Sequence, residues 1–426
     1  MKLDRSIQPE IKSVIDLDYI KPELKFGKNG NRYYVFSGGQ AETVRIEAVL
    51  NGIAYPEHNL AVNYAMDLLT RGTKSKSAFE INQLLDLYGA FLSTETVKDR
   101  SSIVLFTLKK YLNDALPLMC EILSEASYPE SEVHLLKKSE VNQFKINSRK
   151  TSFVAERNFM RLLYGTSHPY GKFSELEDHE NISRDTILDA YNNRIMAGGA
   201  LFMISGNISE SEFEAIDNVL SKLNISDLKG SDVAWYQAPE ISRNEDFKEV
   251  EDAVQTSLRV GRVLPISGAE NMAVASITNV LFGGYFGSRL MSNLREKNGF
   301  TYGVGSGFIT MKHTHLWTIR TEVGKEVAKN ALAEIYKELE ILQNNIPSDE
   351  ELLRVKRYLS GNLVGKFENI HSLPVHFRNI ILRNEPFDFY KTMAREINKV
   401  RPEQISKFAL DNWKKEHLSE LSAGAK

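Results

Sequence analysis

The sequence predicts an α+β protein with two domains of similar design, each a mainly antiparallel sheet with helices packed on one face. The chain has 426 residues, which is more than a single hydrophobic core ordinarily accommodates. Alternating segments and helix-period segments follow one another in both halves. The order and spacing of these segments in the first half recur in the second half.

Two helix-period segments mark the recurring unit, one over residues 113–123 and the other over residues 330–342. Each is followed by a short turn that carries a proline, Pro129 or Pro347, and each turn opens an acidic helix start. The second of these starts, Ser-Asp-Glu-Glu at 348–351, has the spacing of a capping box. We therefore expect a long helix after each proline.

Two glycines extend the correspondence upstream. Gly89 ends a helical pattern before the alternating strand 102–106, and Gly299 ends another before the strand-like run 316–319. The glycines are 210 residues apart and the two prolines 218 residues apart. A nearly constant offset of about half the chain indicates a duplication rather than a short solenoid repeat.

The division between the halves is predicted in a stretch of small, polar and turn-forming residues. We expect a first domain over residues 1–228, a linker over 229–240 and a second domain over 241–426. No low-complexity segment or long run of one charge interrupts this organisation.

Composition narrows the classes of function. The chain has 53 basic and 56 acidic residues, so it lacks the basic field that favours nucleic-acid binding. Its first ten residues contain no apolar stretch typical of a signal peptide, and no apolar run approaches the ~20 residues that span a bilayer. We expect a cytoplasmic protein without membrane segments, or a periplasmic one if a signal has been removed.

A helix-like segment over residues 60–71 ends in a Gly-Thr turn at 72–73, and Gly89-Ala90 follows at a fixed distance. This combination resembles the insulinase, pitrilysin and mitochondrial-processing-peptidase family, the inverted zincins. Its members carry His-x-x-Glu-His just before such a turn. In those proteins the two histidines, on one helix face, hold zinc, and the glutamate takes a proton from the zinc-bound water.

The resemblance places this motif at residues 63–67, which read Asn-Tyr-Ala-Met-Asp. Asn63 and Asp67 stand where the family has histidines, and Met66 stands where it has the general base. Counting 76 residues beyond Asp67 reaches Gln143, where the family has a third, glutamate ligand. Amide oxygens are weak zinc ligands, and a thioether cannot accept a proton. We expect a degenerate zinc site without a metal cofactor; a hard cation at Asp67 is the alternative.

The histidines and the cysteine offer no replacement for the missing ligands. His313 and His315 alternate along an expected strand and so share a face, which predicts a solvent-facing pair rather than a metal site without a third ligand. Cys120 is the only cysteine. It lies in an apolar run and is expected to be a small buried side chain.

The second half contains two runs, 282–290 and 294–303, that resemble the C-terminal domain signature of the same family. In family members an arginine and a tyrosine seven residues apart help to hold the substrate near the zinc. The matching residues here are Arg295 and Tyr302. The alternative is that Arg295 forms a salt bridge within a helix and Tyr302 begins a buried strand.

The resemblance also implies a function. Short members of the family pair, and in some pairs one chain carries the zinc motif while its partner carries the arginine and tyrosine. The sequence therefore predicts a non-catalytic subunit of a heteromeric zinc metalloendopeptidase that acts on unstructured peptides, with zinc only on the partner chain. The alternative is a stand-alone peptide-binding or scaffolding homodimer. An active metallopeptidase is the least favoured reading.

Overall fold

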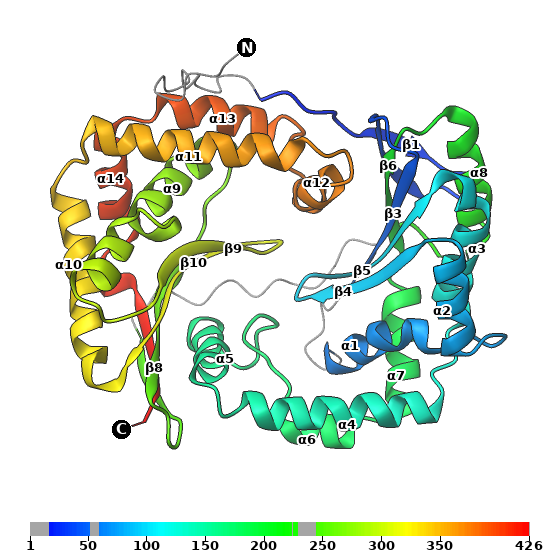
Figure 1. Cartoon of the computed structure of the whole chain (residues 1–426), viewed down its shortest axis with the longest axis horizontal. Helices are drawn as coiled ribbons and strands as arrows, with labels where there is room; N and C mark the ends of the chain where they lie inside the picture. The colour runs from blue at the N-terminus through cyan, green and yellow to red at the C-terminus, as the bar shows by residue number, and fades with distance from the viewer. Residues whose placement is uncertain (1–16, 52–58, 224, 229–243, 426) are drawn as a thin grey trace, which may run out of the picture.

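The computed structural model describes residues 17–51, 59–223, 225–228 and 244–425. The two halves of the chain lie beside each other, each built around its own sheet (Figure 1). The two-domain α+β architecture predicted from the sequence is confirmed. The predicted linker, residues 229–240, lies outside the described residues.

The first half contains a six-stranded sheet. Its strands are β1 (Glu23–Phe26), β2 (Arg32–Ser37), β3 (Thr43–Asn51), β4 (Phe91–Val97), β5 (Arg100–Leu108) and β6 (Ala200–Gly206). Its helices are α1 (Asn59–Leu68), α2 (Ala78–Leu87), α3 (Leu112–Glu125), α4 (Glu130–Asn147), α5 (Thr151–Tyr164), α6 (Leu176–Asn181), α7 (Arg184–Ala190) and α8 (Glu210–Leu220). The strand order is β1-β2-β6-β3-β5-β4, and only the β2–β6 pair is parallel among the described strands of this sheet.

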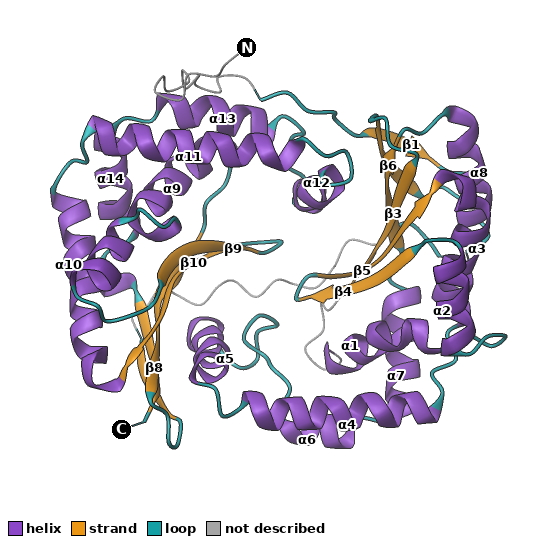
Figure 2. Ribbon diagram, in the orientation of Figure 1, coloured by secondary structure: helices purple, strands orange, loops and turns teal. Residues whose placement is uncertain are grey.

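The second half contains a five-stranded sheet. Its strands are β7 (Glu245–Glu249), β8 (Gln255–Leu264), β9 (Val304–Thr310), β10 (His315–Gly324) and β11 (Ser419–Gly424). Its helices are α9 (Ala269–Asn279), α10 (Ala328–Asn344), α11 (Asp349–Phe367), α12 (Leu373–Leu382), α13 (Phe389–Lys399) and α14 (Pro402–Asn412), with π-helical segments η4 (Val280–Gly284) and η5 (Met291–Lys297). The order is β7-β11-β8-β10-β9. Figure 2 shows β8, β9 and β10 beside the helices of this half.

The segments expected to recur occupy corresponding places in the two halves. Gly89 and Gly299 have φ angles of 55° and 63°, a backbone conformation that favours glycine, and each precedes a β-hairpin. A helix, a proline turn and a long helix follow each hairpin, as α3 and α4 in the first half and α10 and α11 in the second. The duplication itself stays a prediction from the sequence.

The cap of α11 differs from the expected capping box. Ser348 accepts a hydrogen bond from the backbone N–H of Glu351 at 3.2 Å, as predicted. The Glu351 carboxylate instead accepts two hydrogen bonds of 2.8 Å from the Arg289 guanidinium. A bidentate ion pair is a stronger interaction than the backbone contact it replaces. It ties the start of α11 to the segment before η5.

Helices cover both faces of the first sheet. Tyr33 and Val35 belong to the core shared with α1, α3 and α8, whereas the alternating residues Tyr34 and Phe36 belong to the core that contains Phe377 of α12. Because successive side chains of a strand point to opposite faces, α12 covers the face away from the first half's own helices. A helix of the second half thus packs on the sheet of the first.

The second sheet, in turn, is covered on one face by a helix of the first half. Helix α5, from the first half, packs against β8 and β11, and its Phe159 shares a core with Leu421 and Ala423 of β11. The other face of that sheet is covered by helices of its own half, with Trp317 and Trp413 stacked 3.9 Å apart. The expectation of helices on one face is therefore incomplete, because each half places one helix on the other's sheet.

The exchanged helices bring charged groups onto the buried sheet faces. Arg378 of α12 pairs with Glu47 of β3, which also accepts a hydrogen bond from Arg45 at 2.8 Å. Burial by itself raises the pKa of Glu47, but the charges of Arg45 and Arg378 outweigh it and lower the pKa below its usual range. On the second sheet, Thr151 of α5 donates to Glu322 at 3.1 Å.

Two smaller expectations have different outcomes. Cys120 is partly buried against the first core, and burial raises the pKa of its thiol to about 12. His313 and His315 do not form a solvent-facing pair, because β10 begins only at His315, which is buried, while His313 lies exposed in the turn before it. None of the helices in the described part of the chain combines the length and hydropathy needed to cross a bilayer.

Candidate functional site

Helix α1 presents the positions where the sequence predicted a degenerate zinc site. Asn63 and Asp67 lie one turn apart and are both exposed, as side chains four residues apart on a helix share a face. The residues between them are buried: Tyr64, Ala65 and Met66 pack into the first core. The helix thus follows the amphipathic pattern of a helix that covers a sheet.

Met66 is 0% exposed. Its thioether packs among the apolar side chains between α1 and the sheet, so the position where the family has a general base belongs here to the core. A buried thioether has no proton-accepting chemistry near neutral pH. The position that corresponds to the family's general base therefore offers no proton acceptor.

Asp67 has an unusual electrostatic environment. Reduced hydration by the surrounding protein, together with the nearby charge of Glu140 on α4, raises the pKa of its carboxyl to about 6, although Arg71 opposes the change. The residue is exposed by accessible surface, so part of this effect is screened by water. A neighbouring carboxylate disfavours ionisation of Asp67.

Gln143, the position reached by counting, is exposed on α4, and its Nε2 donates to Asn147 Oδ1 at 3.0 Å. The carboxylate that acts on Asp67 belongs to Glu140, three residues earlier on the same helix. The pKa of the Tyr64 hydroxyl on α1 is raised by burial and, to a lesser extent, by the charge of Glu140. Sequence reasoning missed Glu140, although its carboxylate chemistry and its place one turn before Gln143 were available signals.

His179 of α6 lies behind this face. Its Nδ1 is 3.2 Å from the Tyr64 hydroxyl and its Nε2 is 3.2 Å from Ser174 Oγ. Burial lowers the pKa of His179, and the charge of Glu140 partly opposes this. Because both ring nitrogens already have hydrogen-bond partners, this imidazole has a structural role beside α1.

The side chains of this face do not fit zinc. Asn63, Asp67 and Glu140 offer one weakly coordinating amide and two carboxylates, but none of the imidazole or thiolate ligands that zinc sites in proteins ordinarily include. Among the described residues, no group of three or more histidine, cysteine, aspartate or glutamate side chains is arranged to hold a metal ion. No chemical step through a metal is derived for this chain.

Arg295 and Tyr302 lie together at the surface of the second half. The Arg295 guanidinium carbon lies 5.0 Å from the centre of the Tyr302 ring and 4.8 Å from that of Phe286. Tyr302 is 90% exposed and Phe286 is 63% exposed. The guanidinium is thus held by two aromatic rings that are themselves open to solvent. Tyr302 does not begin a buried strand, since β9 starts at Val304.

The backbone beneath this pair is well anchored. Asn293 of η5 donates to Glu334 at 2.9 Å and to Glu338 at 2.7 Å, which fixes η5 on α10. The Thr301 hydroxyl lies 2.7 Å from the carbonyl oxygen of Glu322 and holds the turn before β9. Exposed side chains on fixed backbone suit a preformed contact surface.

The two sets of predicted residues lie in different halves of the chain. Helix α1 packs mainly against α4, α7 and β4, whereas η5 packs against α10 and β9. Asn63 and Asp67 are therefore brought together with Glu140 on one surface, and Arg295 and Tyr302 on another.

Comparison with known proteins identifies the family that the chain resembles. Residues 181–359 match the family model described as the peptidase M16 inactive domain. Over this segment the chain is similar to the M16 peptidases. The family resemblance inferred from the sequence is thereby confirmed, and the matched segment contains Arg295 and Tyr302.

Relatives and solved structures of the M16 homologue agree with this assignment. It is 21% identical to the uncharacterized zinc protease YmxG of Bacillus subtilis over 83% of this chain and 86% of that protein. It is 22% identical to the non-peptidase homolog YmxG of Helicobacter pylori over 80% and 79%. The M16 inactive domain from Pseudomonas fluorescens has the same fold, with a TM-score of 0.85, 22% identity and coverage of 95% and 98%.

A more distant neighbour is part of a larger assembly. A chain of complex III from Candida albicans shares the fold with a TM-score of 0.71 and 13% identity, over 94% of this chain and 95% of that chain. At this identity the likeness concerns the fold alone. It indicates that the two-domain fold occurs in multi-chain complexes.

Proposed function

We propose that this M16 homologue is the non-catalytic subunit of a heteromeric zinc metalloendopeptidase and that it contributes Arg295 and Tyr302 to the zinc site of a partner chain. The observation that carries the proposal is the exposed pair itself. Arg295 is held between two rings, and the Tyr302 ring is 90% exposed, in the half of the chain that does not contain α1. A pair that held substrate at the zinc-motif positions of its own chain would be expected to face α1.

The chemistry of the pair suits a peptide backbone. A guanidinium offers several N–H donors in a planar fork, which matches carbonyl oxygens or a carboxylate of a bound peptide. The phenol of Tyr302 can donate to an oxygen that gains negative charge when an amide is attacked. Both roles require a partner's zinc site close to the exposed rings, and neither requires a metal on this chain.

The sheets offer a further means of holding an extended peptide. Strands β4 and β9 are terminal in their sheets, and within the described residues each pairs on one side only. A free strand edge presents backbone N–H and C=O groups that an extended peptide can use. Unstructured peptides are therefore the substrate class that this surface favours, since a folded chain cannot present its backbone in this way.

A second candidate function uses the same edges without chemistry. A stand-alone peptide-binding or scaffolding homodimer would need the strand edges but not Arg295 or Tyr302. The occurrence of this fold in a chain of complex III keeps a scaffolding role as the alternative. An active peptidase is not proposed, because the buried thioether of Met66 stands at the position of the family's general base and no imidazole stands at the positions of its zinc ligands.

Reconstitution tests the proposal. The partner is a homologous chain with intact His-x-x-Glu-His from the same organism, and cleavage of a quenched fluorescent peptide is followed for each chain and for their mixture. We expect no cleavage by this chain alone, zinc only on the partner, and at least ~10-fold faster cleavage by the mixture. A mixture no faster than the partner alone would contradict the heteromer. Self-association of this chain, without complex formation, would favour the homodimer.

A further inference from the structure

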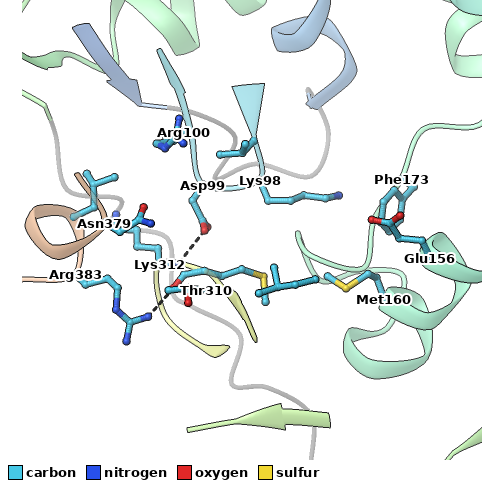
Figure 3. A pocket seen from close by; sticks show the side chains of 14 residues that line it. Lys98, Asp99, Arg100, Glu156, Met160, Phe173, Thr310, Lys312, Asn379 and Arg383 are labelled. Carbon is cyan, nitrogen blue, oxygen red and sulfur yellow. Dashed lines mark hydrogen bonds between the residues drawn. The ribbon is translucent and has the colours of Figure 1, made fainter. Parts of the chain in front are cut away.

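The centre of the molecule contains a cavity of about 320 Å³, within the size range of ligand pockets. Four elements line it: the β4–β5 hairpin, the β9–β10 hairpin and the two exchanged helices, α5 and α12 (Figure 3). Each half of the chain thus contributes one hairpin tip and one helix. The cavity is separate from Arg295, Tyr302 and the α1 face, none of which lines it.

The terminal strands β4 and β9 both run toward this cavity. Strand β4 ends at Val97 and strand β9 ends at Thr310, and both residues line the cavity. The two hairpin tips approach each other in the middle of the molecule (Figure 1). A peptide that pairs in parallel with either edge runs in the same direction as the strand. The carboxyl end of such a peptide faces the cavity, whereas a peptide that pairs antiparallel would place its amino end there.

The lining carries an excess of positive charge. Its basic residues are Lys98, Arg100, Lys312 and Arg383, and its acidic residues are Asp99 and Glu156. The Asp99 carboxylate is already used, because it accepts hydrogen bonds from the Tyr170 hydroxyl at 2.6 Å and from the backbone N–H of Lys312 at 2.8 Å. Arg100 donates to Glu95 at 2.7 Å.

Lys98 illustrates the shortage of negative charge. Its ammonium group donates to the Lys172 carbonyl at 2.6 Å and lies 3.9 Å from the centre of the Phe173 ring. Burial, with the nearby charges of Arg157 and Arg161, lowers the pKa of Lys98 to about 8. Burial also lowers the pKa of Lys312. An anion in the cavity would stabilise the charged forms of both side chains.

Arg383 is the cation best placed to bind an anion directly. One of its nitrogens donates to the Met311 carbonyl at 2.7 Å, another lies 3.9 Å from a carboxylate oxygen of Glu385, and its side chain is only 15% exposed. A guanidinium has five N–H donors, so donors remain beyond that contact. Asn379, one turn earlier on α12, lies on the same side of the cavity, whereas Glu156 lies on the opposite side (Figure 3).

The remaining walls are apolar. Val97, Met160, Ile309 and Leu382 line the space beside the charged groups. A carboxylate at Arg383 would therefore have room for an attached apolar side chain against these walls. An anion without an apolar body, such as phosphate, would leave this surface uncovered.

We propose that this cavity binds the carboxyl terminus of an extended peptide, with the terminal carboxylate at Arg383 and Asn379 and an apolar last side chain against Val97, Met160, Ile309 and Leu382. The proposal rests on the peptide-binding part of the proposed function and adds a substrate class, peptides with a free, apolar C-terminal residue. It does not depend on Arg295, Tyr302 or a partner chain.

The test uses the full chain without a partner. A ten-residue unstructured peptide that ends in leucine, labelled at its N-terminus, is made as the free acid and as the C-terminal amide, and binding is followed by fluorescence anisotropy. We expect the amide to bind at least ~10-fold more weakly, because it loses the charged hydrogen bonds. Equal affinity of the two forms, or no binding of either, would overturn the proposal.

Variants locate the effect. Arg383→Gln should weaken binding of the acid peptide at least ~10-fold and make its affinity equal to that of the amide peptide. Because Arg383 also donates to the Met311 carbonyl, its removal can disturb the local structure, and Asn379→Ala therefore serves as a second variant. This variant should weaken binding of the acid peptide by about 3-fold or more and leave binding of the amide peptide unchanged. Arg354→Gln, at an exposed arginine on α11, is the matched control and should retain the full preference. Retention of the preference in Arg383→Gln would contradict the assignment.

Competition with N-acetyl-leucine separates a peptide terminus from a free acid of the same chemistry. We expect competition only at concentrations at least ~100-fold above those of the unlabelled peptide, since the amino acid lacks the strand contacts. Equal potency would assign the cavity to small carboxylic acids and overturn the peptide proposal. The reconstitution assay does not depend on this cavity. If the acid and amide peptides bind equally while the mixture of chains still cleaves peptide, only the assignment of the cavity is rejected, and the heteromeric function stands.

Discussion

Arg378 of α12 forms an ion pair with Glu47 in the middle of the first sheet, and the two side chains are 7% and 0% exposed. The pair joins residues from opposite halves of the chain. Together with the exchanged helices, it makes the two halves one interlocked unit. The consequences are measurable in stability, in pH dependence and in binding.

Removal of Arg378 should strongly destabilise the protein. Arg378→Met leaves the Glu47 carboxylate buried with Arg45 as its remaining cation, and loss of one partner of a buried pair typically costs ~3–5 kcal/mol. The free energy of unfolding, from denaturant titration, measures the effect. Arg354→Met, which breaks an exposed pair with Glu350, should change it by less than ~1 kcal/mol. Similar effects of the two variants would show that the pair does not join the halves.

The same pair predicts a loss of stability in acid. The pKa of Glu47 is lowered in the folded protein by Arg45 and Arg378, so the folded state binds its proton less readily than the unfolded state. The contribution is present above the ordinary glutamate pKa of ~4.3 and is lost as the pH falls through the lowered value. A Glu47→Gln variant should show a smaller decrease in thermal stability below about pH 4.5. An unchanged acid dependence would contradict this explanation.

Asp67 should have the opposite effect. Its pKa is raised to about 6, so the folded state binds the proton more tightly, and stability should fall as the pH rises from ~4 to ~6. Asp67→Asn should remove this decrease and raise the melting temperature at pH 7. Asp86→Asn, at an exposed position of α2, is the control. A melting temperature of Asp67→Asn at or below that of the natural protein at pH 7 would argue against it.

Glu140 should complete a zinc site if imidazoles are restored. In an Asn63→His, Asp67→His variant we expect one bound zinc per chain, because two histidines one turn apart and a facing carboxylate form a zinc ligand set. An additional Glu140→Gln change should abolish zinc binding, whereas Gln143→Ala should leave it unchanged. Zinc content after dialysis measures this. Dependence on Gln143 instead of Glu140 would show that the counted position, not the one facing α1, is the third site.

Much of the fold follows from local patterns in the sequence. Gly89, Gly299 and the two prolines mark the ends of elements through backbone preferences that do not depend on distant contacts. The exchange of α5 and α12 is not predictable in this way, because an amphipathic helix pattern shows which face is buried but not which sheet buries it.

The candidate site shows the same limit. Asn63, Met66 and Asp67 were placed correctly on one helix, since a fixed spacing within a helix sets their relative positions. The third position, Gln143, is counted across a long stretch of loops and helices and stays a prediction, and the carboxylate that acts on Asp67, Glu140, lies three residues before it. Arg295 and Tyr302 were found as a neighbouring pair, but Phe286, the second ring beside Arg295, emerged only from the structure.

The kcat/KM for peptide cleavage by the reconstituted pair, with the natural chain or with Arg295→Ala, tests the central claim most directly. We predict a decrease of about 100-fold for Arg295→Ala and for Tyr302→Phe, in the range for loss of one transition-state donor. Arg354→Ala should leave the rate unchanged. Equal rates for the natural chain and both site variants would contradict donation of these residues to a partner's active site.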